Sequence, residues 1–161
     1  MKERCHICGR KMKKESDQCK VCKAASDEQI VSACQSVHNV NFFVNPYVNL
    51  ILTDRRLLVF EDMSMVGSQT TMQGGLVGGL IGKAADKVVE KTLGANGSLK
   101  LDIPLSEIQD VVTEDKAKKG IQVTVNVAGG KCRKFTVARA IADSSAAGGQ
   151  LIDNLKHTAK R

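Results

Sequence analysis

Aromatic residues are scarce in this chain of 161 residues, which has four Phe, one Tyr and no Trp. Any hydrophobic core must therefore be built from Val, Ile, Leu and Ala. The chain has only two Pro: Pro46 excludes a central strand position, and Pro104 ends a strand-like segment. The apolar run 76–81 is far shorter than the roughly 20 residues that span a bilayer. It is therefore not a transmembrane helix.

Recognisable catalytic arrangements are also missing. The three His are scattered, and no Ser/His/Asp set, metal-binding His pair or carboxylate dyad stands out. Gly82-Lys83 resembles the end of a Walker loop, but Val77 stands where that loop needs Gly and Ala84 where it needs Ser or Thr. No G-x-G-x-x-G motif occurs. We therefore expect neither a nucleotide site nor a small-molecule substrate, and an enzyme is the class that we expect least.

Four of the six cysteines stand in two C-x2-C pairs, Cys5 with Cys8 and Cys19 with Cys22. A C-x2-C turn places two sulfurs on one side of a tight loop, and two facing turns supply the four tetrahedral ligands that suit Zn²⁺. We therefore predict a zinc ion bound by these four residues. Because four sulfurs complete a tetrahedral site, no position remains for a substrate, and the predicted zinc is structural.

Segment 1–24 is too small for a hydrophobic core, so we expect metal binding to supply its folding free energy. The Cys-x2-Cys-Gly motif ending at Gly9 resembles the short zinc ribbons at the N-termini of many prokaryotic proteins. Lys23 follows the second pair where such ribbons have Gly, and we expect a less regular second turn. Residues 23–28 read as a short linker.

A framework of three disulfides in an oxidising compartment is the alternative for six cysteines. We prefer metal, because paired C-x2-C spacing in an intracellular protein favours it. Met1 is followed almost at once by the first pair, which leaves no room for a signal peptide. We expect a cytoplasmic protein, with the periphery of the inner membrane face as the alternative. Cys34 and Cys132 lie in strand-like segments, and we expect both to be small buried apolar residues.

The net charge of +7 is unevenly distributed. Residues 1–24 contain eight Lys or Arg against three acidic residues, which gives this segment +5. Part of this charge compensates the negative charge of four thiolates around Zn²⁺. The functional alternative is a surface for nucleic acid or an acidic partner. Against nucleic acid, the segment has no aromatic residue on which a base could stack.

From residue 29 onward the hydrophobic pattern mostly has a period of two, which predicts strands. Gly129-Gly130 predicts a hairpin turn. A helix is predicted from a cap at Asp143 or Ser144 to about residue 157, with an apolar stripe that includes Leu151 and Leu155. The seven predicted strands are 30–37, 48–53, 55–61, 98–103, 108–113, 120–127 and 131–137.

Seven strands followed by one helix resemble the pleckstrin-homology-like superfold, in its bacterial PH and GRAM forms. Residues 49–60, N-L-I-L-T-D-R-R-L-L-V-F, are similar to the L-T-D-x-R-L-x-V-F hairpin of GRAM-type domains, and 103–108 to their I-P-L-x-x-I segment. The resemblance implies an α+β, mainly β fold. A small zinc ribbon (1–24) would precede a seven-stranded PH-like barrel or sandwich (28–159) with a C-terminal helix.

Residues 62–97 form a Gly-rich insertion between the third and fourth predicted strands, and 72–93 reads as a helix. Gly74, Gly78 and Gly82 recur every four residues. Each glycine destabilises a helix by roughly 1 kcal/mol, so another contact must offset them. Three interpretations remain open: a flexible loop leading into a shorter helix, a helix packed against a second copy or a partner, and an interfacial membrane helix.

Two further groups of side chains have alternative interpretations. Phe42, Phe43 and Tyr47 lie between the first two strands, either in the core or at an exposed apolar tip for a partner or a membrane. The segment 37–48 has no Lys or Arg, so phosphoinositide binding is not supported. A basic cluster is either a solvated face or a contact for anionic lipid or nucleic acid; it comprises Lys116, Lys118, Lys119, Lys131, Arg133 and Lys134.

We therefore predict a non-enzymatic, zinc-binding adaptor or interaction module. Its PH-like domain would be a platform for binding a protein or a membrane surface, and we expect a protein partner or self-association. One alternative is a nucleic-acid-binding protein that uses the basic ribbon. The other is a peripheral membrane protein anchored by the Gly-rich insertion.

Overall fold

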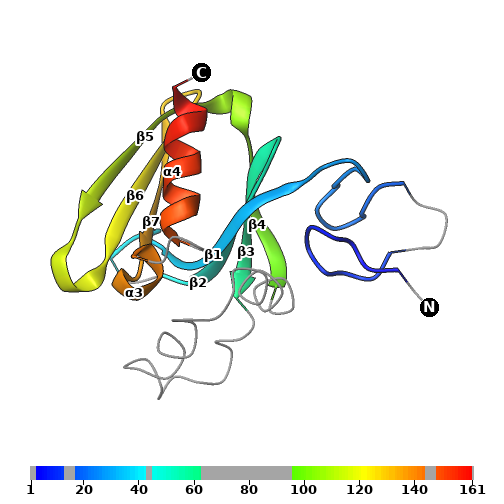
Figure 1. Cartoon of the computed structure of the whole chain (residues 1–161), viewed down its shortest axis with the longest axis horizontal. Coiled ribbons are helices and arrows are strands. Elements are labelled where there is room, and N and C mark those ends of the chain that lie inside the picture. The colour runs from blue at the N-terminus through cyan, green and yellow to red at the C-terminus, as the bar shows by residue number, and fades with distance from the viewer. Residues whose placement is uncertain (1–2, 13–16, 43–44, 63–95, 144–147, 161) are drawn as a thin grey trace, which may run out of the picture.

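The computed structural model describes residues 3–12, 17–42, 45–62, 96–143 and 148–160. Its seven strands are antiparallel and form one sheet in the order β4-β3-β2-β1-β7-β6-β5. Figure 1 shows α4 on one side of this sheet and the N-terminal cysteine segment beside β3 and β4. The strands are β1 (Ile30–His38), β2 (Tyr47–Thr53), β3 (Arg56–Asp62), β4 (Asn96–Pro104), β5 (Ile108–Asp115), β6 (Ile121–Val127) and β7 (Lys131–Val137).

The sheet consists of two halves that meet at the end of β1. This strand pairs along its length with β2, but it reaches β7 only through Val37 opposite Thr136 and His38 opposite Phe135. Within the described residues, β4 and β5 do not pair and form the two edges. The predicted barrel is therefore not closed, and the mainly β fold is a sheet bent over one core.

The main core lies between the two halves of the sheet and helix α4 (Gly148–Ala159). The α4 residues Leu151 and Leu155 are fully buried, as the predicted apolar stripe requires. Alternate residues of β6 face the same core, and Val123 and Val125 are inaccessible to solvent. The period-two pattern of β6 therefore decides which face is buried.

The predicted strands agree with the observed ones to within two residues at each end. Gly129 and Gly130 have φ values of 84° and 74°, which suit the predicted hairpin turn between β6 and β7. The predicted helix start differs, because Asp143 is the C-cap of a short helix, α3 (Arg139–Ala142). Ser144 lies outside the described residues. Two 3-10 turns, η2 (Leu105–Glu107) and η3 (Ala117–Lys119), flank β5.

The predicted insertion is shorter at both ends than the sequence indicates. Asp62 belongs to β3, and Asn96 and Gly97 belong to β4. The Gly-rich helix predicted over 72–93 lies outside the described residues. Within the part of the chain that is described, no helix is both long and apolar enough to cross a membrane.

Candidate metal centre

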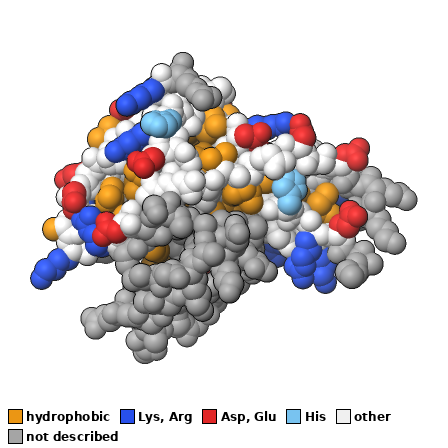
Figure 2. Space-filling model, viewed as in Figure 1, with side chains coloured by type: hydrophobic (Ala, Val, Ile, Leu, Met, Phe, Trp, Pro, Cys, Tyr) orange, Lys and Arg blue, Asp and Glu red, His pale blue; other side chains and the backbone are white. Residues whose placement is uncertain are grey.

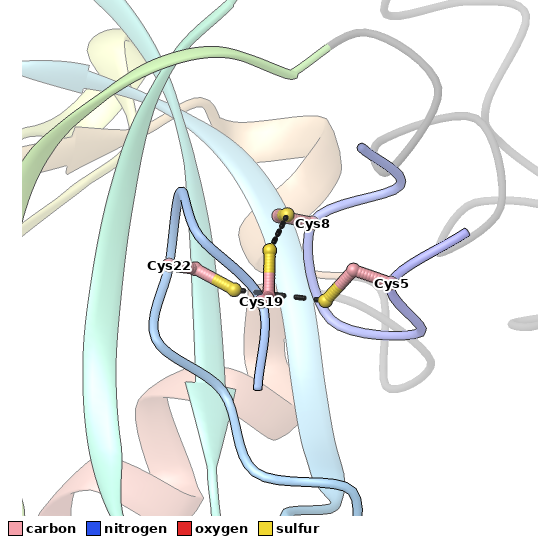
Figure 3. Close-up of side chains that lie close together, drawn as sticks. All are labelled: Cys5, Cys8, Cys19 and Cys22. Atoms are coloured by element: carbon pink, nitrogen blue, oxygen red, sulfur yellow. Dashed lines mark hydrogen bonds between the residues drawn. The ribbon is translucent and has the colours of Figure 1, made fainter. Parts of the chain in front are cut away.

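The four predicted ligands converge on one buried point. The Sγ atoms of Cys5, Cys8, Cys19 and Cys22 all lie within 4.8 Å of one another. Figure 3 shows the two pairs pointing toward each other from facing loops. Each first-pair sulfur contacts one sulfur of the second pair at 3.6 Å, Cys5 with Cys22 and Cys8 with Cys19. All four side chains are buried.

This arrangement fits a tetrahedral metal ion. Zn–S bonds of about 2.3 Å place the sulfurs of a tetrahedral site about 3.8 Å apart, close to the observed 3.6 Å contacts. Four thiolates suit a soft or borderline ion such as Zn²⁺ better than Ca²⁺ or Mg²⁺, which prefer oxygen. The four sulfurs are therefore arranged so that one metal ion could be held among them.

The electrostatics of the cluster favour a bound cation. The contact with Cys22 lowers the pKa of Cys5 below its usual range, and backbone N–H groups of Ile7 and Cys8 add to this effect. The pKa of Cys22 is raised, mainly by its contacts with Cys5 and Cys8 and by burial. Sulfurs this close do not all carry negative charge without a cation between them.

The two cysteine turns have the same backbone geometry. In the first, the Gly9 N–H donates to the Cys5 carbonyl, and the Cys5 N–H donates to the Arg10 carbonyl. In the second, the Lys23 N–H donates to the Cys19 carbonyl, and the Cys19 N–H donates to the Ala24 carbonyl. Gly9 has φ 71° and Lys23 has φ 56°. The second turn is therefore as regular as the first, contrary to expectation, because Lys23 adopts the left-handed conformation itself.

This correspondence extends to a repeat of 14 residues, which sequence reasoning missed. The bridge between Arg4 and Lys11 recurs between Gln18 and Ala25. The side chains of Arg4 and Gln18 also make equivalent bonds, to the carbonyls of Gly9 and Lys23. Aligning the two cysteine pairs would have found the signal, although only the cysteines are identical between the repeats. The ribbon thus has approximate internal symmetry.

The symmetry is broken where the ribbon meets the sheet. Ile7, at the tip of the first turn, is 0% exposed, whereas its counterpart Val21 is 40% exposed. Ile7 and the four cysteines belong to one apolar cluster with residues of the sheet; the sheet members are Ala33, Ile51, Leu58 and Phe60. The ribbon, defined here as residues 3–12 and 17–25, therefore packs on the sheet.

The residues after the ribbon hold it to the turn between β2 and β3. Asp27 pairs with Arg55, and the buried carboxylate of Glu28 accepts bonds from Arg56 and Thr53. The Gln29 N–H donates to the Asp54 carboxylate, and the Asp54 N–H donates to the Gln29 carbonyl. The linker predicted over 23–28 is thus a clamp. Thr53 Oγ1 also accepts hydrogen bonds from the backbone N–H groups of Arg55 and Arg56 in this turn.

The other two cysteines differ from each other. Cys34 is buried in the main core, as predicted, and burial raises its pKa to about 12. Cys132 is exposed, and the prediction that it is buried is wrong. Cys132 and Phe135 are three positions apart on β7, so their side chains point to opposite faces of the sheet. Phe135 points into the core, and Cys132 therefore points away from it. None of the six cysteines forms a disulfide.

The aromatic and basic groups predicted from the sequence are separated. Phe42 is 91% exposed and Val40 is 54% exposed, whereas Tyr47 is half-buried. Phe43 lies outside the described residues. The predicted basic cluster is spread along the hairpin of β6 and β7: the lysines around η3 precede Ile121, Lys134 pairs with Thr124, and Lys131 pairs with Val127. The length of β6 places Lys131 about 20 Å from η3, whereas Lys134 lies about half as far from it.

Comparison with known proteins leaves the chain without a family assignment. The scan against protein-family models found no match, and the search of curated proteins found none either. The four-cysteine centre, the clamp and the bent sheet are therefore the observations from which its function is inferred.

Proposed function

We propose that this chain is a non-enzymatic, zinc-binding interaction module. The observation that carries the proposal is the closed set of four buried sulfurs at residues 5, 8, 19 and 22. Because four protein ligands leave no open position for water or substrate, such a site serves folding rather than catalysis. The proposal includes Zn²⁺ as the metal, since thiolates in tetrahedral positions suit it best.

The second part of the proposal is that the sheet is a PH-like platform. Its support is the succession of seven antiparallel strands followed by α4, together with the similarity of residues 49–60 and 103–108 to GRAM-type segments. A fold of this kind carries many functions, so the binding surface must be argued from its own side chains.

The loop between β1 and β2 is the surface that we assign to a protein partner. Val40 and Phe42 expose most of their apolar side chains there, and no Lys or Arg occurs between residues 37 and 48. A buried Phe removes 150–250 Å² of surface from water, roughly, so this position suits the centre of a contact. The lack of basic residues favours a protein over an anionic membrane.

Metal analysis tests the first part of the proposal. Protein purified under reducing conditions should contain about one zinc per chain, as one closed four-ligand site requires. Cys19→Ser should remove most of the bound zinc, whereas Cys132→Ser should leave it unchanged because Cys132 is exposed and remote. Wild-type protein that neither contains nor takes up zinc would contradict the proposal.

Site-specific crosslinking tests the partner surface. A photo-crosslinking amino acid at position 42 should link a specific protein, or a second copy of the chain, when irradiated in cells. The matched control is position 150, since Gln150 is exposed on α4. Equal products from both positions, or none from position 42, would count against the loop.

Nucleic-acid binding is a second candidate, favoured by the exposure of the ribbon's basic side chains (Figure 2). Arg4, Arg10, Lys11, Lys20 and Lys23 are exposed, and none forms an ion pair with a described residue. Retention on DNA or RNA should then fall with salt and weaken in the double variant Arg10→Gln, Lys11→Gln with zinc still bound. The remaining alternative, anchoring by the Gly-rich insertion, concerns residues outside the described ranges.

A further inference from the structure

The half of the sheet next to the ribbon is apolar on both faces. In β2, Leu50 and Leu52 face the main core, whereas Ile51 points to the other side. In β3, Leu57 and Val59 face the main core, whereas Leu58 and Phe60 point to the other side. All of these side chains are almost completely buried. We call the side that carries Ile51, Leu58 and Phe60 the outer face.

The ribbon is part of what buries the outer face. Its Ile7 and its four cysteines form one cluster with the outer-face residues, and Met12 packs at the edge of this cluster. The ribbon contributes few apolar side chains besides the cysteines, so it has no core of its own. Its position therefore depends on the metal ligands on one side and on the sheet on the other.

A short chain of contacts joins the metal centre to the sheet. His6, between two ligands in sequence, donates from Nε2 to the Glu28 carbonyl at 2.6 Å. The side chain of Glu28 then binds Arg56 at the start of β3. A change in the first cysteine turn therefore acts directly on the contacts that hold the ribbon against β2 and β3.

We propose that metal occupancy controls access to the outer face. With metal bound, the ribbon covers Ile51, Leu58 and Phe60. Without metal, the cysteine turns lose the ion that joins them, the ribbon detaches, and these three side chains become accessible while the main core stays intact. This inference rests on the proposed zinc binding, but it concerns what the metal does to the sheet.

Oxidative footprinting of side chains on the full-length protein tests the proposal, because it reports each face separately. Phe60 faces the ribbon and Phe135 faces the main core, and both are 0% exposed. Removing zinc with a chelator should increase the labelling of Phe60 several-fold and leave that of Phe135 unchanged. Adding zinc back should restore the protection of Phe60.

Two substitutions at equivalent positions of the repeat separate docking from metal binding. Ile7→Ser keeps all four ligands, so it should bind zinc and yet expose Phe60 to labelling without a chelator. Val21→Ser changes the corresponding residue of the second turn, which is already 40% exposed, and should leave Phe60 protected.

Three results would overturn the proposal. Phe60 could stay protected after zinc is removed, which would mean that the cover does not need metal. Phe135 could become labelled together with Phe60, which would mean that the whole domain unfolds. A full-length protein that takes up no zinc at all would overturn the proposed function as well, and metal analysis identifies that case before footprinting.

Discussion

The carboxylate of Glu28 binds the guanidinium of Arg56 through two hydrogen bonds, from Nε at 2.9 Å and from Nη2 at 2.8 Å. Glu28 is 2% exposed and lies just before β1, whereas Arg56 begins β3. Arg56 also donates to Asp102 on β4 at 2.7 Å. The pair thus joins the residues after the ribbon to two strands of the sheet, in a position that is largely shielded from water.

Replacing Glu28 with Gln should destabilise the folded protein. The substitution leaves the Arg56 charge largely buried with only Asp102 as a charged partner, and breaking a buried pair in this way costs about 3 kcal/mol or somewhat more. Urea unfolding of the zinc-loaded protein measures the change. Asp27→Asn is the matched control, because it removes the exposed pair with Arg55 and should change the free energy of unfolding little. Equal effects of the two substitutions would contradict this prediction.

The same pair predicts a pH dependence. Burial raises the pKa of Glu28, but the bonds from Arg56 and Thr53 outweigh burial, and the pKa is lowered. Because the pKa is lower in the folded protein, ionised Glu28 stabilises the fold at pH values above its unfolded pKa of about 4.3. This stabilisation is lost as the pH falls through the pKa of the folded protein. The stability difference between wild type and Glu28→Gln should therefore be constant near neutral pH and shrink below about pH 4.3. Both proteins keep the four cysteines, so metal loss in acid largely cancels in this difference.

Replacing Lys23 with Gly should stabilise the ribbon. Lys23 has φ 56°, a left-handed conformation that disfavours residues with a side chain by roughly 1–2 kcal/mol. Gly removes this cost, but the greater freedom of Gly in the unfolded chain offsets part of the gain, so we expect a net stabilisation of about 1 kcal/mol. Lys23→Ala removes the same charge but keeps the strain and should give no such gain. Competition with a zinc chelator measures both variants, and tighter zinc retention by Ala than by Gly would refute the explanation.

Replacing Gly120 with Ala should destabilise the far half of the sheet. An added Cβ would lie 2.0 Å from the Val137 carbonyl oxygen, and φ at this position is 122°. Because backbone atoms surround the site, we expect a loss of about 3 kcal/mol or more. Gly129→Ala is the control: φ is 84° there, but the space is open, so only the strain of about 1 kcal/mol applies. Thermal unfolding compares the two variants, and similar melting temperatures would exclude the predicted clash.

The convergence of the four cysteines and the positions of the strands could be predicted because both depend on local spacing. Two residues between cysteines place both sulfurs on one side of a turn, whatever the rest of the chain does. Alternation in β6 likewise selects its buried face. The same alternation predicts that Cys132 is exposed, since Lys134 and Thr136 share its face of β7. Both of these residues are polar and partly or fully exposed. At this position the place in the strand, and not the residue type, decides the exposure.

The start of α4 could not be predicted from the sequence. Asp143 is a good cap by residue type, yet it ends α3, whose backbone bonds run from Asp143 back to Arg139. Gly148 packs so closely on this short helix that an added Cβ would lie 2.6 Å from the Ile141 carbonyl oxygen. This contact between α3 and α4 is set by packing, which a local pattern of caps does not report.

The sequence by itself determined the convergence of the four cysteines, the seven strands and the buried faces of β6 and α4, because each follows from residue type and short spacing. Segments 50–52 and 57–60 are continuously apolar, as strands buried on both faces are. Only the tertiary structure decided that the ribbon covers one of those faces, with Ile7 buried and Val21 exposed. These contacts join residues more than 25 positions apart, so they depend on how the clamp at Glu28 and Arg56 orients the ribbon.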